Sequence, residues 1–226
     1  MRKFTFSFAL LITVSVFAQE NNAEKIITGI KNKINKVENY SAEVQVSVKF
    51  DFLKMPKSKA EIFFKKPDKF KLKSQKLAIL PKGVIDFNPQ KILDKDFTSE
   101  IIGDTLVDGK KLSVIKIIPN ADSIKFASAK LLVDKNEFLI KQIILSLKEN
   151  AKIITYFNYS DQKEYALPSE IKINLDFSQA EEGENNRRRN IPDNFKGDIS
   201  IIYSNYKINK GIDDSVFTDE NDKNSK

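Results

Sequence analysis

The amino-acid sequence predicts a mainly β protein with few helices, built around one wide antiparallel sheet. Apolar and polar residues alternate through most of the chain, and this period of two is typical of strands with one buried face. Short turn signals separate these runs without a helix between them. The runs add up to roughly ten or eleven strands, which is wide enough for the sheet to curl. The pattern leaves open whether the sheet closes into a filled barrel or stays open around an apolar cavity.

The first 18 residues have the features of a signal peptide. The basic pair Arg2-Lys3 precedes an apolar run over residues 4–17, and Ala18-Gln19 is a small-residue cleavage site. The run is shorter than a membrane span, and the chain has no Cys for lipid attachment. We therefore expect a soluble protein exported to the periplasm, and a retained N-terminal anchor is the alternative. A single domain is expected over residues 19–218, followed by a flexible polar tail over residues 219–226.

Composition narrows the function more than any single motif. The 226 residues contain no Cys and no His, which removes disulfides, thiolate metal sites, the commonest general base and the commonest metal ligand. The formal net charge of +7 is spread along strand exteriors and turns, apart from one cluster at Arg187–Arg189. Nucleic-acid-binding proteins concentrate positive charge on one face and interleave aromatic residues for stacking, whereas the Phe residues here are expected at buried strand positions. We therefore expect no nucleic-acid partner. The positive charge either meets an anionic lipid or cell-envelope surface, or forms a solvated Lys-rich surface that binds no partner.

An amphipathic helix precedes the strands. Apolar residues recur at helical spacing from Ala23 to Val37, which predicts about four turns ending near Asn39. Gly29 inside this stretch lowers the helix propensity. Because the helix has only one apolar side, we expect it to lie on the sheet.

Three strands follow in succession, joined by breaks at Met55–Lys57 and Lys65–Asp68. Their apolar positions are spaced by two and belong to one face: Val44, Val46, Val48, Phe50 and Phe52, then Ala60, Ile62 and Phe64, then Phe70 and Leu72. An apolar face of this length needs a cover, which one helix is too small to provide alone.

The rest of the chain continues the strand pattern. Residues 76–88 predict two short strands or one bent strand, a short helix begins at Pro89, and Asp108-Gly109 is a strong hairpin signal. Further strands are expected over residues 127–133, 138–147, 153–159, 171–177, 199–203 and 206–208. Their one-sided apolar positions include Ile143, Leu145, Ile173 and Leu175. The hydrophilic stretch over residues 179–198 is expected to be an exposed excursion between two strands.

The motifs with known chemistry are weak in this sequence. Ser160 and Lys163 match S-x-x-K, but the other elements of that catalytic pattern are absent and the site lies in a polar turn. The acidic candidates lack EF-hand spacing and fit turns or outward strand positions: Asp104, Asp108, Asp213, Asp214, Glu43 and Glu61. There is no glycine motif for dinucleotide or phosphate binding. We predict no catalytic residue, no metal and no cofactor.

Several short motifs follow one another in a characteristic order. After the amphipathic helix and strand comes a short strand ending in a basic residue, a Pro and an aromatic residue, within Phe63-Phe64-Lys65-Lys66-Pro67-Asp68-Lys69-Phe70. Residues 102–109 and 130–135 then give a G-x-x-x-x-D-G and L-V-D-K core, and residues 167–171 and 206–217 a closing pattern. This order resembles the LolA-type outer-membrane lipoprotein carriers and their superfamily, which includes lipoprotein-sorting-like and RseB-like periplasmic proteins. The likeness covers nearly the whole mature chain.

The resemblance implies an open half-barrel of about eleven antiparallel strands with a helical lid over an apolar cavity. In the carriers, that cavity shields the acyl chains of a lipoprotein crossing the periplasm. Lys66 takes the place of an Arg that helps to hold the lid, although Lys lacks the planar multi-donor geometry of Arg. Phe70 takes the place of a cavity-lining aromatic residue; the alternative is a polar turn at Lys66-Pro67 with Phe70 in the core. The expected cavity-lining residues are Val46, Val48, Phe50, Phe52, Ile62, Phe64, Phe70, Leu72, Ile143, Leu145, Ile173 and Leu175.

Two functions remain open at this stage. The first is a monomeric periplasmic carrier that binds lipoprotein acyl chains or other lipid and shuttles them toward the outer membrane, with inner- and outer-membrane sorting components as partners. The second is a sensor or scaffold of the RseB type that binds a protein partner. A dry apolar cavity favours the carrier, whereas a filled core with an exposed apolar or charged patch favours the sensor. Both functions are achieved by binding alone, so we expect no enzyme.

Overall fold

The computed structural model describes residues 22–74, 90–94, 96–120, 126–147, 151–178 and 194–218. The predicted signal peptide, the polar tail, the strands expected within residues 76–88 and the Arg187–Arg189 cluster lie outside these ranges. The helical elements of the described part are the helix α1 (Asn22–Ile34), the short helix α3 (Gln90–Leu93) and the 3-10 turns η1 (Lys163–Tyr165) and η2 (Asp214–Phe217).

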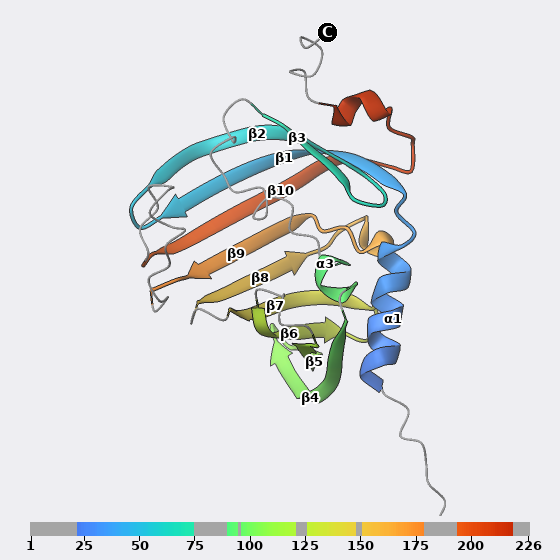
Figure 1. Ribbon diagram of the computed structural model, residues 1–226, viewed down its shortest axis with the longest axis vertical. Helices are drawn as coiled ribbons and strands as arrows, with labels where there is room; N and C mark the ends of the chain where they lie inside the picture. Colours follow the sequence, from blue (N-terminus) through green and yellow to red (C-terminus); the bar gives the residue numbers. More distant parts are fainter. Residues whose placement is uncertain are drawn as a thin grey trace, which may run out of the picture.

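The described strands form one ten-stranded antiparallel sheet (Figure 1). They are β1 (Asn39–Phe50), β2 (Lys54–Lys65), β3 (Lys69–Lys73), β4 (Phe97–Val107), β5 (Lys110–Pro119), β6 (Phe126–Asp134), β7 (Leu139–Leu147), β8 (Lys152–Asn158), β9 (Glu170–Asp176) and β10 (Lys196–Ile208). The hairpin turn predicted at Asp108-Gly109 joins β4 to β5, and both residues have the positive φ that such a tight turn requires, 48° and 73°.

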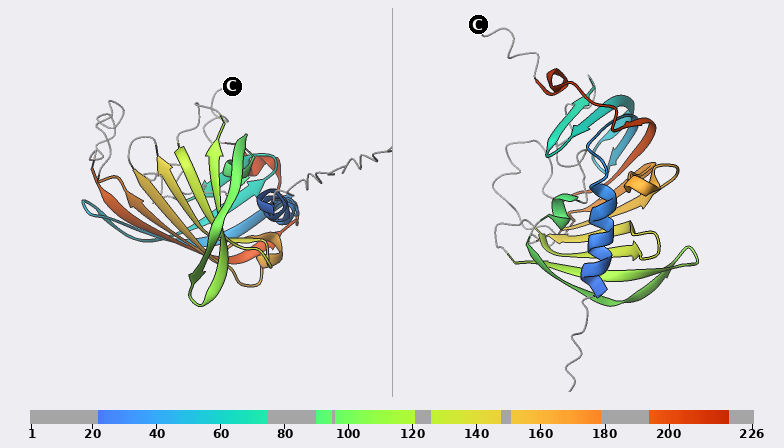
Figure 2. Two further views of the ribbon diagram at one scale, coloured as in Figure 1. Left: turned by 90° about the horizontal axis from the view of Figure 1, so that it is seen from below. Right: turned by 90° about the vertical axis from the view of Figure 1, so that its right-hand side faces the viewer.

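The sheet order is β3-β2-β1-β10-β9-β8-β7-β6-β5-β4, so the two halves of the chain meet where β1 pairs with β10. The edge strands β3 and β4 are consecutive in sequence, yet they lie at opposite edges and do not pair with each other. The sheet is strongly curved and remains open (Figure 2). This settles the choice that the sequence left open: the described strands form an open half-barrel, and not a closed barrel.

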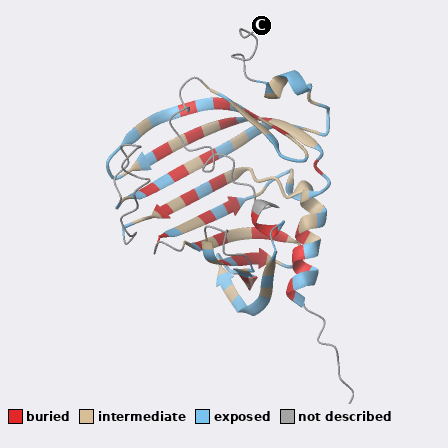
Figure 3. Ribbon diagram, in the orientation of Figure 1, coloured by how far each residue is buried: buried red, intermediate tan, exposed pale blue. Residues whose placement is uncertain are grey.

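Buried and exposed residues alternate along the strands, as the period of two predicts (Figure 3). On β1 the inward residues Val44, Val46 and Val48 are 2%, 1% and 2% exposed. Cross-strand partners in an antiparallel sheet share a face, so buried residues such as Val46, Ile201 and Ile171 line the same concave side. The apolar side of α1 and the two buried residues of α3, Ile92 and Leu93, belong to the same cluster. The cover that the concave face requires therefore includes both helices.

The helix α1 ends at Ile34 and not near Asn39, as its apolar spacing predicted. The amides of Lys36 and Val37 donate to carbonyls only three residues back, at 3.2 and 3.1 Å, which tightens the last turn. The side chain of Asn209, just after β10, then donates to the Lys36 carbonyl and accepts from the Glu38 amide, each at 2.8 Å. A distant residue thus takes over the hydrogen bonds that a longer helix would have made, and Val37 is buried as part of a turn.

Three strand boundaries also differ from the prediction. The break expected at Met55–Lys57 is a bulge inside β2, opposite β1 between Val46 and Val48, so the strand continues through it. The last predicted strands are one continuous β10, which keeps pairing with β1 through a second register shift. Finally, β10 begins at Lys196, where it pairs with β9, so the predicted excursion ends earlier than residue 198.

Candidate functional site

The concave face carries eleven of the twelve residues predicted to line a cavity. Eight of them are buried: Val46, Val48, Ile62, Phe64, Ile143, Leu145, Ile173 and Leu175. The other three, Phe50, Phe70 and Leu72, are half-buried and pack against the same cluster. The register explains this gathering, because Ile62 lies opposite Leu72, Phe64 opposite Phe70, and Leu175 opposite Gly197 and Ile153. The sheet thus brings together residues that are more than 100 positions apart in sequence.

Phe52 is the exception. The strand β1 ends at Phe50, whose amide and carbonyl bond to Leu53 at 2.7 and 3.3 Å and close a turn. Phe52 lies in this turn with 43% of its surface exposed, so its assignment to the cavity lining by simple alternation was wrong. Its ring stacks on Phe50 with a centroid distance of 5.3 Å.

A cluster of four phenylalanines lies at this end of the sheet, and we call it the aromatic rim: Phe50, Phe52, Phe177 and Phe195. The ring of Phe195 meets Phe50 and Phe52 edge-on at 5.6 and 5.7 Å and stacks on Phe177 at 4.9 Å. The β1–β2 turn and the β9 and β10 ends that carry the rim lie at the end of the strands opposite α1 (Figure 1). Sequence reasoning missed Phe195, since the signal was a lone aromatic residue at the edge of a polar stretch.

The helix α1 lies across the other end of the strands (Figures 1 and 2). Gly29 allows a close approach here, because a side chain at that position would overlap the ring of Phe138. Lys33 Nζ donates to the Lys163 carbonyl at 3.1 Å, and burial lowers the pKa of Lys33. Lys163 Nζ in turn pairs with Glu137 at 2.8 Å. A close apolar contact and a short polar chain thus hold the helix in place.

Lys66, the residue predicted to contact a lid, reaches the end of this helix. Its Nζ donates to the carbonyl of Asn35, the residue after α1, at 2.7 Å and to Glu38 Oε1 at 2.8 Å. A cation near a helix C-terminus is favourable because the last carbonyls and the helix dipole present negative charge. Lys66 therefore links the β2–β3 turn to the segment between α1 and β1.

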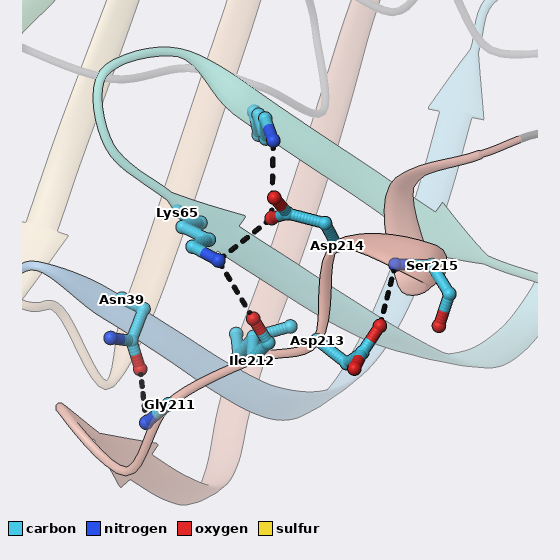
Figure 4. Close-up of polar contacts among 8 residues, drawn as sticks. Asn39, Lys65, Gly211, Ile212, Asp213, Asp214 and Ser215 are labelled. Carbon is cyan, nitrogen blue, oxygen red and sulfur yellow. Dashed lines mark hydrogen bonds and ion pairs between the residues drawn. The ribbon is translucent and has the colours of Figure 1, made fainter.

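The closing motif of the sequence docks beside Lys66 through a polar cluster shown in Figure 4. Gly211 N donates to Asn39 Oδ1 at 3.0 Å. Lys65 Nζ donates to the Ile212 carbonyl at 3.0 Å and pairs with Asp214 Oδ1 at 2.7 Å. Asp213 accepts from the Ser215 amide at 2.8 Å and so caps η2. The motif's role in the described part of the chain is to fasten the C-terminal segment to the first hairpin.

A family model described as "-like: Uncharacterized protein" matches residues 84–221, which is more than half of the chain. The chain belongs to this family. No curated protein sequence matches it.

Solved structures identify the fold. A lipoprotein-sorting protein domain from Vibrio parahaemolyticus, described as putative and outer-membrane, matches with a TM-score of 0.61 at 9% identity, covering 87% of this chain and 96% of that one. A LolA superfamily protein from Nitrosomonas europaea matches with a TM-score of 0.54 at 11% identity, covering 88% and 98%. A DUF1329 family protein from Desulfovibrio piger matches with a TM-score of 0.53 at 10% identity, covering 87% and 97%. The chain has a LolA-like fold.

Two hollows on the convex face of this LolA-like sheet are lined largely by charged and polar side chains. One, of about 430 Å³, lies over β1, β8, β9 and β10, and its charged lining residues are Lys49, Asp51, Lys152, Asp176, Lys196 and Asp198. The other, of about 500 Å³, lies over β1, β2 and β10, and includes Glu43, Lys59, Glu61 and Lys73. The concave face is different, since residues such as Ile115, Ile117 and Leu131 are 0% exposed there. Most apolar residues on the concave face of the LolA-like half-barrel are therefore buried.

Lys163 of the S-x-x-K match is held in an ion pair with Glu137. Glu137 hydrogen-bonds Lys163 and raises its pKa, which is the opposite of what a general base needs. Burial also raises the pKa of Tyr159 and Tyr206, whose hydroxyls donate to the Ile140 and Pro168 carbonyls, each at 2.8 Å.

The acidic candidates are likewise engaged or exposed. Asp104 pairs with Lys111 at 3.0 Å and accepts from Ser113, and these bonds lower its pKa. Glu43 and Glu61 lie opposite each other on the exposed convex face. The described residues contain no cluster of acidic side chains suited to a metal ion, and none of their helices is long and apolar enough to cross a membrane.

Proposed function

We propose that the protein is an exported, periplasmic carrier that binds the acyl chains of lipoproteins or other lipid against its concave face and shuttles them toward the outer membrane. The observation that supports this function best is the continuous apolar concave face of an open LolA-like half-barrel, covered in part by α1 and α3. The proposed function needs no catalytic residue, and its partners are the acylated cargo and the sorting components of the two membranes.

The ligand in this proposal replaces the cover of the concave face. Because central residues such as Ile143 and Ile173 are only 1% and 2% exposed, an acyl chain reaches them only when a covering element moves away. Each methylene buried is worth about 0.8 kcal/mol, so one long acyl chain offers on the order of 10 kcal/mol. Apolar contact is therefore sufficient for binding, and Lys66 at the end of α1 is positioned to hold the helix in the covered state.

The test is native mass spectrometry of the mature protein purified from cells, followed by lipid extraction. The carrier function predicts co-purifying acylated species that are lost in Phe70→Glu, which places a charge on the concave face. Ile202→Glu is the matched control, because Ile202 is 47% exposed on the convex face. A clean ligand-free mass, with no uptake of an added fluorescent acyl probe by the unmodified protein, would refute the carrier.

One observation favours a second candidate, a sensor or scaffold that binds a protein partner. Large apolar residues are exposed away from the concave face, including Leu106 at 74%. This function predicts a protein captured from envelope extracts by the wild type and also by Phe70→Glu, without any lipid in the mass spectrum. Retained lipid that depends on Phe70 would decide against it.

A further inference from the structure

The turn between β1 and β2 exposes two large apolar side chains at the aromatic rim. Phe52 and Leu53 are 43% and 42% exposed, and they lie side by side in a closed turn at the end of the sheet opposite α1. The three other rings of the rim pack against the core cluster, and two of them, Phe50 and Phe195, contact the Phe52 ring. Adjacent exposed apolar residues on a rigid base are typical of an interaction surface.

The charges beside this turn are basic and available. Lys49, Lys54 and Lys57 are exposed, and in the described part of the chain no ion pair engages any of them. The nearby acids accept hydrogen bonds from other groups: Asp51 Oδ2 from the Lys196 amide at 3.0 Å, and Asp198, opposite Lys49, from Asn174 at 2.6 Å. Asp176 pairs with Lys196 Nζ at 3.2 Å. The turn therefore presents apolar side chains flanked by three lysines that form no ion pair within the described residues, beside the single carboxylate of Asp51.

We propose that this turn docks the protein on an anionic phospholipid membrane, with Phe52 and Leu53 entering the headgroup region and the three lysines contacting lipid phosphates. Apolar side chains combined with flanking lysines fit the interface of an anionic bilayer. A protein partner fits less well, since lysine is depleted from protein–protein interfaces. This docking goes beyond carriage of acyl chains and does not require it.

The proposed docking turn lies next to the concave face. Phe50 and Phe195 connect the exposed turn to the concave face, because they contact both Phe52 and the core cluster, and Phe177 stacks on Phe195. If the concave face carries an acyl chain, as proposed above, the docked rim lets that chain pass to the bilayer along aromatic side chains, without crossing water. Only this route rests on the proposed carrier function.

The first test uses tryptophan fluorescence. The chain has no Trp, so Phe52→Trp introduces a unique reporter at the turn. We expect a blue shift of its emission on adding vesicles of phosphatidylethanolamine and phosphatidylglycerol, and quenching by brominated acyl chains in the same vesicles. Ile202→Trp on the convex face is the matched control and should show neither effect. Unchanged emission of Phe52→Trp, or equal quenching of both variants, would overturn the proposal.

The second test measures vesicle co-sedimentation of the full mature chain. Each lysine near an anionic surface contributes about fivefold in affinity, so Lys49→Gln/Lys54→Gln/Lys57→Gln should weaken binding about 100-fold. The charge-matched control replaces Lys25, Lys135 and Lys207, which are exposed elsewhere, and should change binding less than about threefold. Phe52→Ser/Leu53→Ser should weaken binding at least about tenfold, against little change for Leu106→Ser/Ile202→Ser.

The outcomes separate docking from carriage. Equal binding to phosphatidylcholine vesicles, equal losses in the control variants, or capture of a protein with no vesicle binding would each overturn membrane docking. Acyl-probe uptake measured on the same variants reports on the carrier alone. Vesicle binding without any uptake would refute the carrier and leave docking established, and uptake without vesicle binding would do the reverse.

Discussion

Gly29 offers the sharpest test of how α1 is seated. In the middle of a helix, Gly→Ala ordinarily stabilises a protein by about 0.5–1 kcal/mol. Here a Cβ at position 29 would lie 2.6 Å from Phe138 Cε1 and 2.7 Å from Cγ, inside van der Waals contact. Phe138 packs against the core cluster, which limits how far its ring gives way. Overpacking of this kind costs about 1–3 kcal/mol, so Gly29→Ala should lower the free energy of unfolding by about 1 kcal/mol.

Urea unfolding monitored by circular dichroism measures this change, and a second variant reverses its sign. In a Phe138→Ala background the overlap is absent, so Gly29→Ala should raise the free energy of unfolding by about 0.5–1 kcal/mol. Thr28→Ala is the matched control, because Thr28 is an exposed neighbour on the same helix and should gain a few tenths (~0.3 kcal/mol) in either background. Stabilisation by Gly29→Ala in the unmodified protein would refute the close packing of α1 on Phe138.

Three further predictions concern polar groups. Lys66→Met should speed amide hydrogen exchange in α1 and lower the free energy of unfolding by about 1 kcal/mol, because the variant loses the hydrogen bonds to Asn35 and Glu38. Unchanged exchange in α1 would contradict this prediction. Thr155→Val should raise the free energy of unfolding by about 1 kcal/mol, seen as a higher urea midpoint, since the buried Thr155 hydroxyl has no hydrogen-bond partner in the described residues. A lower urea midpoint would reveal a missed partner. Lys65 lowers the pKa of Asp214 below 3.8. The ion pair therefore stabilises the fold above that pH, and this stabilisation is lost as the pH falls through the lowered value. Asp214→Asn should therefore make the Tm fall less steeply at acid pH, and an unchanged pH dependence of the Tm would refute this role of the pair.

The strands were predictable because their determinants are local. Val44, Val46 and Val48 face inward since a strand alternates whatever its partners are, and Asp108-Gly109 turns the chain because those two residues accept positive φ. The same reasoning placed eleven cavity candidates on one face before any pairing was known. The resemblance supplied what periodicity left open, an open half-barrel in place of a closed barrel.

The remaining features depend on contacts between distant residues. The end of α1 is set by Asn209, which lies 171 positions from the Glu38 amide that it accepts from. Phe52 leaves the alternation because the turn closes at Phe50 and Phe195 offers an aromatic partner 143 positions away in the numbering. The sequence indicated only that Gly29 lowers the helix propensity, whereas in the structure its missing side chain leaves space for the Phe138 ring. Periodicity carries no information about any of these partners.

The two ends of the half-barrel differ in what holds them, and this difference bears on how a carrier of this shape would open. At the helical end, polar contacts such as Lys66 to Asn35 are partly exposed and each is worth at most about 1 kcal/mol. The buried side of α1 consists of Ala23, Ile26, Ile27 and Ile30, whose burial contributes about 5–9 kcal/mol. Opening therefore costs mainly apolar contact, which an acyl chain worth on the order of 10 kcal/mol restores as it binds. The free energy offered by the acyl chain thus exceeds the free energy lost with the α1 contacts by only a small amount. In the proposed carrier, cargo can therefore displace the helix, and the helix can displace the cargo once a bilayer at the aromatic rim accepts it.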